Sequence, residues 1–194
     1  MTPALVAVHE GHMKVLRLLV EEGNADVNQA DEDGTTPAYI AAMKGHLQVL
    51  RLLVEKGNAD VNQAAVNGLT PAFAAAVKGH LQVLRLLIQK GADVNRAVDG
   101  GMTPALVAVH EGHMKVLRLL VEEGNADVNQ ADEDGTTPAY IAAMKGHLQV
   151  LRLLVEKGNA DVNQAAVNGL TPAFAAAVKG HLQVLRLLIQ KGAD

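Results

Sequence analysis

The residues of this chain that could carry chemistry are, first, its eight histidines. The segment His9-Glu10-Gly11-His12 has the composition of the helical motif in which two histidines hold a zinc ion and a glutamate serves as base. The segment is one residue too short for that motif, however, and Gly11 places a turn between the two histidines. We therefore do not expect the two rings on one helix face, and we predict no metal site here.

Six of the histidines occupy one repeated position, directly after a glycine and at the start of an apolar segment: His12, His46, His80, His113, His147 and His181. Equivalent residues of packed neighbouring helices lie about 10 Å apart. Zinc holds its ligands at about 2 Å, so two such histidines cannot share one ion. We interpret these histidines as structural, and we predict no bound metal or cofactor.

Paired carboxylates at Glu21-Glu22 and at Asp31-Glu32-Asp33 are candidates for acid–base catalysis. The first pair is expected at the end of a helix and the second group at the tip of a turn, both exposed to solvent. Nothing at such positions would raise the pKa of a carboxyl group as general acid catalysis requires. The chain also has no Ser, no Cys and no glycine-rich phosphate loop. The sequence therefore predicts no catalytic residues and no enzymatic activity.

The elements that must position these side chains are repeated six times along the 194 residues. The tripeptide Thr-Pro-Ala begins at Thr2, Thr36, Thr70, Thr103, Thr137 and Thr171, in steps of 34, 34, 33, 34 and 34 residues. A fixed period of this length predicts one structural unit used repeatedly. The expected segments are about 1-30, 31-64, 65-97, 98-131, 132-165 and 166-194.

A longer period is superimposed on the first, because residues 1–93 recur unchanged as residues 102–194. Natural repeats that drift apart rarely remain identical over so long a segment. The identity indicates either a very recent duplication or deliberate construction, and of these two we favour construction.

The first half of the segment 31–64 predicts a short capped helix. Thr36 can accept a hydrogen bond from the first helical turn, and Pro37 can occupy that turn without losing one. Residues 38–44 then form about two turns, too short a helix to persist alone. Gly45 is expected to end it in the left-handed conformation.

The second half of the segment predicts a longer helix from His46 to Lys56, ended by Gly57. Its polar residues Gln48, Arg51 and Glu55 form one stripe, and most of the others are aliphatic. Each segment is therefore expected to be two antiparallel helices and a projecting turn. Its apolar faces are covered only when it stacks on the segments before and after it.

These motifs resemble the ankyrin repeat over essentially the whole chain. Gly34-Thr35-Thr36-Pro37, Ala41-Ala42-Met43-Lys44-Gly45-His46 and Lys90-Gly91-Ala92-Asp93-Val94-Asn95 stand at the spacing of that family. The resemblance implies a mainly α-helical solenoid of six stacked helix-turn-helix units, a single stack over residues 1-194, with short β-hairpin or turn fingers. It also implies a protein or peptide partner, bound on a concave face of fingertips and first helices.

The chain departs from the family pattern in two places. After Thr-Pro the family usually has Leu-His, whereas this chain has Ala4-Leu5, Ala38-Tyr39 and Ala72-Phe73. We expect an apolar contact to replace the hydrogen bonds of that histidine. An extra asparagine, at Asn24, Asn58, Asn125 and Asn159, lengthens four connections, and we expect it to form a bulge in the loop.

The resemblance further implies which positions select a partner. On the fingertips they are Glu32, Asp33, Thr35, Val66, Asn67, Leu69, Asp99, Gly100, Met102, Glu133, Asp134, Thr136, Val167, Asn168 and Leu170. On the first helices they are His9, Glu10, Met43, Lys44, Val77, Lys78, His110, Glu111, Met144, Lys145, Val178 and Lys179. The two halves carry identical residues here. The positions are therefore either a selected binding surface or filler in a repeat scaffold without a natural partner, made for folding, stability or self-assembly.

Charge and composition limit the classes of partner. The net charge is -4, from 17 basic and 21 acidic residues, which gives no electrostatic reason to expect a nucleic acid or a membrane. No apolar run approaches the roughly 20 residues of a membrane span. Met1-Thr2-Pro3 does not begin like a signal peptide. We expect a cytoplasmic, or recombinant, protein.

The terminal helices are as apolar as the internal ones. Leu5, Val6 and Val8 belong to the first helix, and the last helix runs from Leu182 to Ile189. Repeat stacks normally have terminal units with a polar outer face, and neither terminal segment of this chain has one. Both ends are therefore expected to expose apolar surface. A second molecule docked head to tail would cover that surface, in a contact that does not close and favours filaments.

Overall fold

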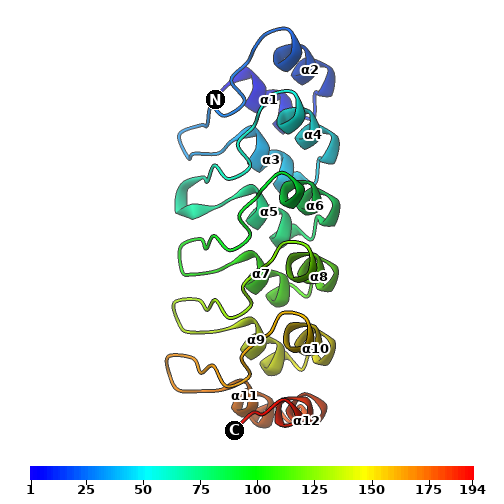
Figure 1. The fold of residues 1–194 in the computed structure, drawn as a ribbon. Coiled ribbons are helices and arrows are strands. Elements are labelled where there is room, and N and C mark those ends of the chain that lie inside the picture. Colours follow the sequence, from blue (N-terminus) through cyan, green and yellow to red (C-terminus); the bar gives the residue numbers. More distant parts are fainter. The chain divides into compact units, whose positions relative to one another are not determined.

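The computed structural model describes residues 1–194 and is mainly helical, with twelve α-helices, one short 3₁₀-helix and no β-strand. It contains two compact units, Met1–Val98 and Asp99–Asp194. The colours of Figure 1 run from blue to green along the first unit and from green to red along the second. The boundary between the units lies one residue after the expected boundary between the third and the fourth segments. That all six segments form a single stack stays a prediction.

Each unit contains three helix pairs, and each pair is a first and a second helix joined by a Gly-His turn. The first unit has α1 (Pro3–His9) and α2 (Met13–Glu21), α3 (Pro37–Lys44) and α4 (Leu47–Glu55), then η1 (Val66–Gly68), α5 (Pro71–Lys78) and α6 (Leu81–Gln89). The second has α7 (Pro104–His110) and α8 (Met114–Glu122), α9 (Pro138–Lys145) and α10 (Leu148–Glu156), and α11 (Pro172–Val178) and α12 (Leu182–Gln190). None of these helices has the length and the apolar composition that a membrane crossing requires.

The first helices begin as the sequence predicts. The hydroxyl of Thr36 accepts a hydrogen bond from the N–H of Tyr39, at 3.1 Å, and Pro37 is the first helical residue. The other first helices repeat this cap with Thr2, Thr70, Thr103, Thr137 and Thr171. At the other end of α3, Gly45 is left-handed, with a φ of 74°, and turns the chain into α4.

The second helices bury one side and expose the predicted polar stripe. Leu50 and Leu53 of α4 are fully buried, whereas Gln48 and Arg51 are exposed. Arg51 forms an ion pair with Glu55, four residues further along, at 3.0 Å. The predicted orientation of this helix is therefore confirmed.

The end of the second helix differs from the expectation. α4 ends at Glu55, and the left-handed residue that follows is the extra Asn58 (φ 56°), not Gly57. Gly57 is needed for space, because a Cβ atom there would lie 2.8 Å from the carbonyl oxygen of Leu53. In the third pair, which lacks the extra asparagine, Gly91 itself is left-handed (φ 83°). The loop thus accommodates the insertion, as expected, and the asparagine takes over the left-handed position.

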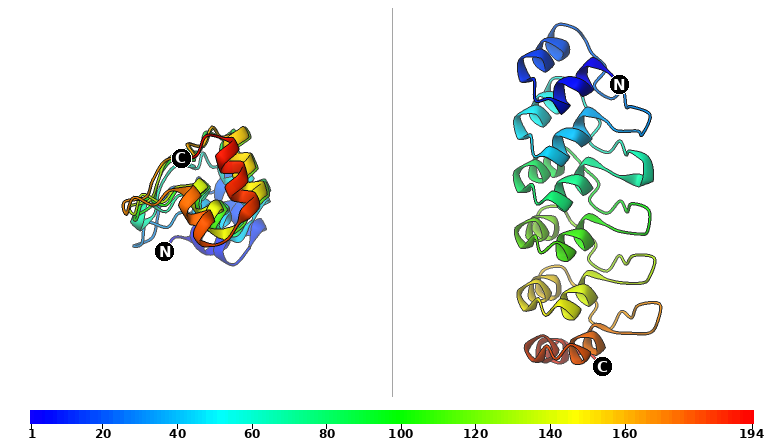
Figure 2. Two further views of the ribbon diagram at one scale, coloured as in Figure 1. Left: turned by 90° about the horizontal axis from the view of Figure 1, so that it is seen from below. Right: turned by 180° about the vertical axis from the view of Figure 1, so that it is seen from behind.

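Within each unit the first helices pack against one another more extensively than the second helices do. Ala41, Ala42, Ala75 and Ala76 of α3 and α5 are fully buried, and their small side chains allow the helices to approach closely. In both views of the ribbon, the first helices of a unit lie between its second helices and its projecting fingers (Figures 1 and 2). Fingertips and first helices therefore share one side of each unit.

The fingers are tight turns rather than paired strands. The N–H of Asp31 donates to the carbonyl of Thr35 at 3.1 Å, and the N–H of Gly34 donates to the carbonyl of Asp31 at 3.0 Å. The carboxylate of Asp31 also accepts hydrogen bonds from the N–H groups of Asp33 and Thr35, at 3.1 and 2.8 Å. Asp31 is half-buried, so the expectation of a fully exposed carboxylate is wrong for this residue, which holds the turn.

The position after Thr-Pro-Ala provides the apolar contact expected in place of the family's histidine. Leu5 and Phe73 are buried at this position, while Tyr39 is half-buried. The aromatic and aliphatic side chains thus supply packing at the base of the first helix.

Candidate functional site at the fingertips and first helices

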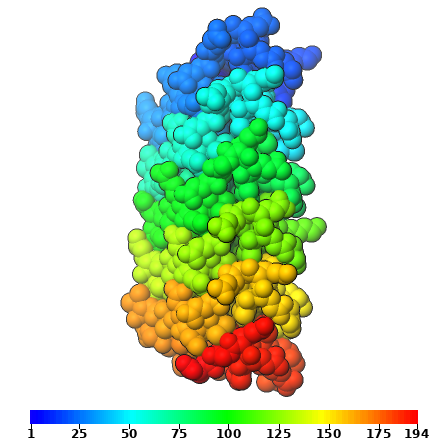
Figure 3. Space-filling model, viewed as in Figure 1, coloured from blue at the N-terminus to red at the C-terminus, as the bar shows by residue number.

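All the residues predicted to contact a partner are accessible in the structure. Each of them is either exposed or half-buried, and none is buried. The side chains fill the gaps between the ribbons of each unit, so its accessible features are surface side chains and shallow hollows (Figure 3). Val66 and Val167 stand out among them, because these apolar fingertip side chains are 54% and 79% exposed.

Main-chain hydrogen bonds join successive fingertips within a unit. In the first unit the N–H of Val66 donates to the carbonyl of Asp33 at 2.9 Å. In the second unit the N–H of Val167 donates to the carbonyl of Asp134 at 2.9 Å, and the N–H of Glu133 donates to the carbonyl of Gly100 at 3.1 Å. These bonds hold the side chains of neighbouring fingertips at a fixed spacing.

A hollow of about 350 Å³ lies in the second unit, where two fingertips meet a first helix. We call it the fingertip hollow, and its lining residues are Asp134, Thr136, Tyr140, Ala166, Val167 and Asn168. Four of these six are residues that the sequence predicts as partner-binding. The hollow combines one carboxylate, two hydroxyl groups and one amide with two apolar side chains.

The sequence pattern does not indicate Tyr140 or Ala166 as site residues. Tyr140 belongs to α9, at the position that is Leu106 in the pair before it and Phe174 in the pair after it. A phenol hydroxyl at a position otherwise filled by apolar residues is the signal that distinguishes it. A tyrosine hydroxyl is protonated at neutral pH and can donate a hydrogen bond. In the equivalent Tyr39 of the first unit, burial raises the pKa further.

Two of the predicted site lysines have partners within the chain. Nζ of Lys44 donates to the carbonyl of His9, and Nζ of Lys145 donates to the carbonyl of His110, both at 2.6 Å. These carbonyls belong to the last residues of α1 and α7. A carbonyl at the C-terminus of a helix has no N–H donor within that helix, so it needs a partner from elsewhere. The two lysines therefore stabilise the end of the preceding first helix, as well as lying on the predicted face.

Histidines of the Gly-His turns also connect one helix pair to the first helix of the preceding pair. Nε2 of His80 lies 3.2 Å from the carbonyl oxygen of Met43, and Nε2 of His181 lies 3.1 Å from that of Met144. A carbonyl only accepts, so Nε2 carries the proton in both rings. These histidines have the structural role predicted from the sequence.

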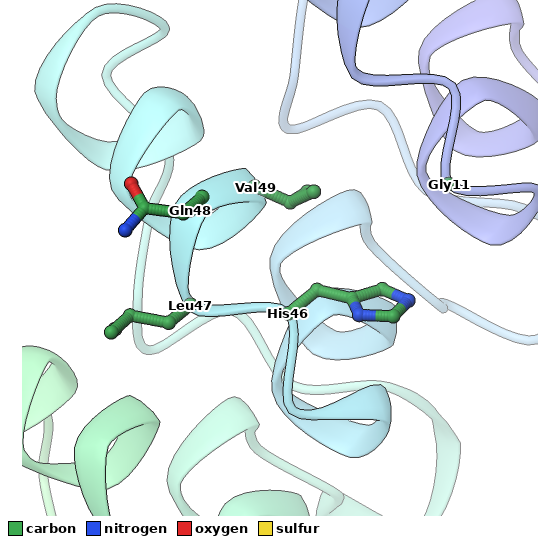
Figure 4. Close-up of a pocket in the computed structure, with 5 residues that line it drawn as sticks. All are labelled: Gly11, His46, Leu47, Gln48 and Val49. Atoms are coloured by element: carbon green, nitrogen blue, oxygen red, sulfur yellow. The ribbon is translucent and has the colours of Figure 1, made fainter.

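Hollows beside the Gly-His turns are a consequence of stacking. One of about 280 Å³ is lined by Gly11 and by residues 46–49 of the next pair. In Figure 4, the ring of His46 and the side chain of Val49 extend on the side of Gly11, whereas Leu47 and Gln48 extend away from it. Similar hollows of about 300 and 290 Å³ lie beside Gly45 and Gly112. Each is lined by the glycine of one pair and by the histidine, the glutamine and aliphatic residues at the start of the next second helix, so their recurrence follows from the stacking of pairs.

The His9-Glu10-Gly11-His12 segment contains a hydrogen-bonded pair. Nδ1 of His9 lies 2.9 Å from Oε1 of Glu10, and this hydrogen bond lowers the pKa of Glu10. His9 is the last residue of α1 and His12 precedes α2, so the two rings do not share a helix face, as predicted. No group of three or more His, Asp or Glu side chains is arranged to hold a metal ion.

Apolar side chains are exposed at both ends of the described chain. Those of Val6, Val15 and Leu18 are 41, 49 and 55% exposed, and those of Phe174, Val178, Leu182 and Ile189 are 50, 65, 63 and 60% exposed. Leu5 and Val8, which the sequence also suggested as exposed, are instead buried, because they pack inside the first unit. The expectation of apolar ends is otherwise confirmed.

Comparisons with known proteins give one family. The family model for ankyrin repeats in three copies matches residues 1–65, 58–132 and 124–194. No curated protein matches the chain. Among solved structures, the chain is similar to the ankyrin repeat domain of Bcl-3, a unique member of the IkappaB protein family, with a TM-score of 0.88 and 29% identity over 100% of this chain and 87% of that chain. Since the family model extends over the whole sequence, the chain belongs to the ankyrin repeat family.

Proposed function

We propose that this chain is a non-enzymatic binding module that holds a protein or a peptide against its fingertips and first helices. Ankyrin repeats are generally protein–protein interaction modules. The observation that carries the proposal is the fingertip hollow, which gathers side chains from two fingertips and one first helix. A concave site with a few convergent polar groups is the usual form of a binding site.

The chemistry of the fingertip hollow suits a peptide or loop with an apolar side chain next to a hydrogen-bond donor. Val167 offers exposed apolar surface, of the kind that marks interaction sites. The carboxylate of Asp134 only accepts hydrogen bonds, so it pairs with a Lys, an Arg or a main-chain N–H. Tyr140 and Asn168 can both donate and accept, which orients the partner's own main chain.

The first unit carries the same residues at Asp33, Thr35, Tyr39, Val66 and Asn67, so we propose two related sites in each chain. Their turns differ in conformation. Asn67 is left-handed, with a φ of 64°, whereas the side chain of Asn168 accepts a hydrogen bond from the N–H of Leu170 at 3.1 Å. Two sites of the same composition can therefore bind one kind of partner with unequal affinity.

Affinity capture with matched variants tests this proposal. Val66→Glu combined with Val167→Glu places a charge on both fingertip sites, while Gln48→Glu combined with Gln149→Glu places the same charges on exposed positions of the second helices. We expect the first variant to lose a captured partner at least about tenfold in affinity, because buried apolar anchors dominate such interfaces. The control should bind like the original chain. Equal losses in both variants, or none in either, would contradict the proposed face.

A scaffold without a natural partner is the second candidate, and the identity of residues 1–93 with 102–194 favours it. Generic surface positions in a built array would be copied together with the core. In that case the chain would fold and unfold cooperatively but capture no stoichiometric partner, and the fingertip variants would behave like the original chain in every assay. The cytoplasmic location expected from the sequence likewise stays a prediction.

A further inference from the structure

One apolar face of the first helix pair is not covered by another pair, whereas the same positions of the second pair are covered. We call it the N-side face, and it consists of Val6 on α1 with Val15 and Leu18 on α2. These side chains are 41 to 55% exposed. The residues at the same positions of the second pair, Ile40, Val49 and Leu52, are no more than 7% exposed.

The reason for this difference is the stacking of pairs within the unit. α3 packs on α1, and α4 packs on α2, so each pair after the first has its corresponding side chains covered by the pair before it. The same positions of the third pair, Ala74, Val83 and Leu86, are buried in the same way. The N-side face is therefore one half of a stacking contact.

The other half of such a contact is exposed in the second unit. The C-side face consists of Phe174 and Val178 on α11 with Leu182 and Ile189 on α12, all at least 50% exposed. At the same positions of the preceding pair, the four side chains are half-buried, because α11 packs on α9 and α12 packs on α10. The C-side face is the side of a pair on which a following pair stacks.

The two faces have the sequences of two consecutive pairs of the chain. Residues 172–190, which carry the C-side face, are identical to residues 71–89. The pair that follows residues 71–89 along the chain is 104–122, and its sequence is identical to that of residues 3–21, which carry the N-side face. The N-side face of a second copy therefore has the same sequence as the pair that follows residues 71–89 in this chain.

We propose that the N-side face of one copy docks on the C-side face of another copy. The contact continues the pair-on-pair stacking seen within each unit, and it buries apolar surface that is otherwise in water. Because the two faces differ, the contact is heterologous, and a docked pair still has one free face of each kind. The assembly therefore grows beyond two copies as the concentration rises.

Sedimentation velocity on the 194-residue chain, over a range of concentrations, tests the proposal with four proteins. Val15→Glu with Leu18→Glu removes the N-side face, and Leu182→Glu with Ile189→Glu removes the C-side face. Gln48→Glu with Gln149→Glu is the control, because it places the same number of charges on exposed positions outside both faces and outside the fingertip hollow. All the substituted side chains are exposed, so circular dichroism should show the same helix content in every variant. This property keeps a loss of association distinct from a loss of folding.

We expect the unsubstituted chain and the control with Gln48→Glu and Gln149→Glu to increase in mean mass with concentration. Each face variant alone should sediment as a monomer. An equimolar mixture of the two face variants should give one complex of twice the monomer mass and nothing larger, because only one competent contact can form. A strictly monomeric unsubstituted chain, or a face variant that still associates with itself, would overturn the proposal. The outcome is independent of the proposed partner site, because the residues substituted in the two face variants belong neither to the fingertip hollow nor to the predicted partner-binding positions.

Discussion

The imidazole ring of His80 lies directly against Gly45, the residue that ends the first helix of the preceding pair. A Cβ atom on Gly45 would be 2.7 Å from Cε1 of that ring. The same ring donates a hydrogen bond to the carbonyl of Met43. The missing side chain at Gly45 and the hydrogen bond of His80 are therefore two parts of one connection between stacked pairs.

Gly45→Ala should destabilise the chain more than Gly112→Ala does. Both glycines are left-handed with a φ of 74°, which costs a residue with a side chain about 1–2 kcal/mol. Nothing lies within 4 Å of a Cβ atom on Gly112, whereas at Gly45 the ring of His80 must move and lose its hydrogen bond, at a further cost of about 1 kcal/mol. Urea unfolding followed by circular dichroism measures the difference. Equal midpoints for the two variants would show that the ring contact has no effect on stability.

Asn62→Ala should weaken the connection between the second and third loops of the first unit. Oδ1 of Asn62 accepts a hydrogen bond from the N–H of Asp93 at 2.7 Å, and Nδ2 donates to the carbonyl of Gly91 at 2.9 Å. Loss of both should cost about 1–2 kcal/mol in the free energy of unfolding. Hydrogen exchange at the amide of Asp93 should accelerate in the variant. The exposed Gln82→Ala on α6 is the control and should leave that amide unchanged, so faster exchange in both proteins would contradict the assignment.

Leu50→Asp should unfold much of the first unit, and Gln48→Asp should have almost no effect. Leu50 is fully buried, so an aspartate there is an unpaired charge in an apolar environment, at a cost of several kcal/mol. Gln48 is two residues away on the exposed stripe of the same helix. Thermal unfolding of both variants measures the contrast. Similar losses of stability would mean that α4 is oriented differently.

The carboxyl group of Glu10 should titrate at a lower pH than an ordinary glutamate. The hydrogen bond from His9 lowers its pKa, and His110 lowers the pKa of Glu111 in the same way. A depressed pKa in the folded state contributes stability that is present above the unfolded pKa and is lost as the pH falls through the folded pKa. The group is exposed, so the effect on stability is small, and an NMR titration of the Glu10 side chain is the suitable measurement. His9→Ala should return its pKa to the ordinary range, and an unchanged value would exclude the hydrogen bond as the cause.

Most of the local fold could be predicted from the sequence because the signals act over a few residues. Thr36-Pro37 specifies a helix start and Gly45 a helix end, each through the backbone of its own turn. The position of the left-handed residue after α4 could not be predicted in this way. Both Gly57 and Asn58 can adopt that conformation, so the residue types alone do not decide between them, and the structure places it at Asn58.

Only part of the candidate site could be predicted from the sequence, because some of its contacts join residues that are far apart in the chain. Exposure of Val167 and Asp134 follows from their place at a fingertip, which the repeat pattern identifies. The pairing of Lys44 with His9 joins residues 35 positions apart, so it depends on how one pair stacks on the next. The place of Tyr140 in the hollow depends on stacking in the same way, since three of the other lining residues, 166–168, belong to the following fingertip.

Hydrogen–deuterium exchange of the chain alone and in complex with a captured partner tests the proposed binding face most directly. Binding at the fingertips and first helices predicts slower exchange in the turns 132–136 and 166–170, and in the corresponding turns of the first unit. The second helices, such as α10, should exchange equally fast with and without the partner. Protection confined to the second helices, with unchanged fingertips, would contradict the proposed binding face.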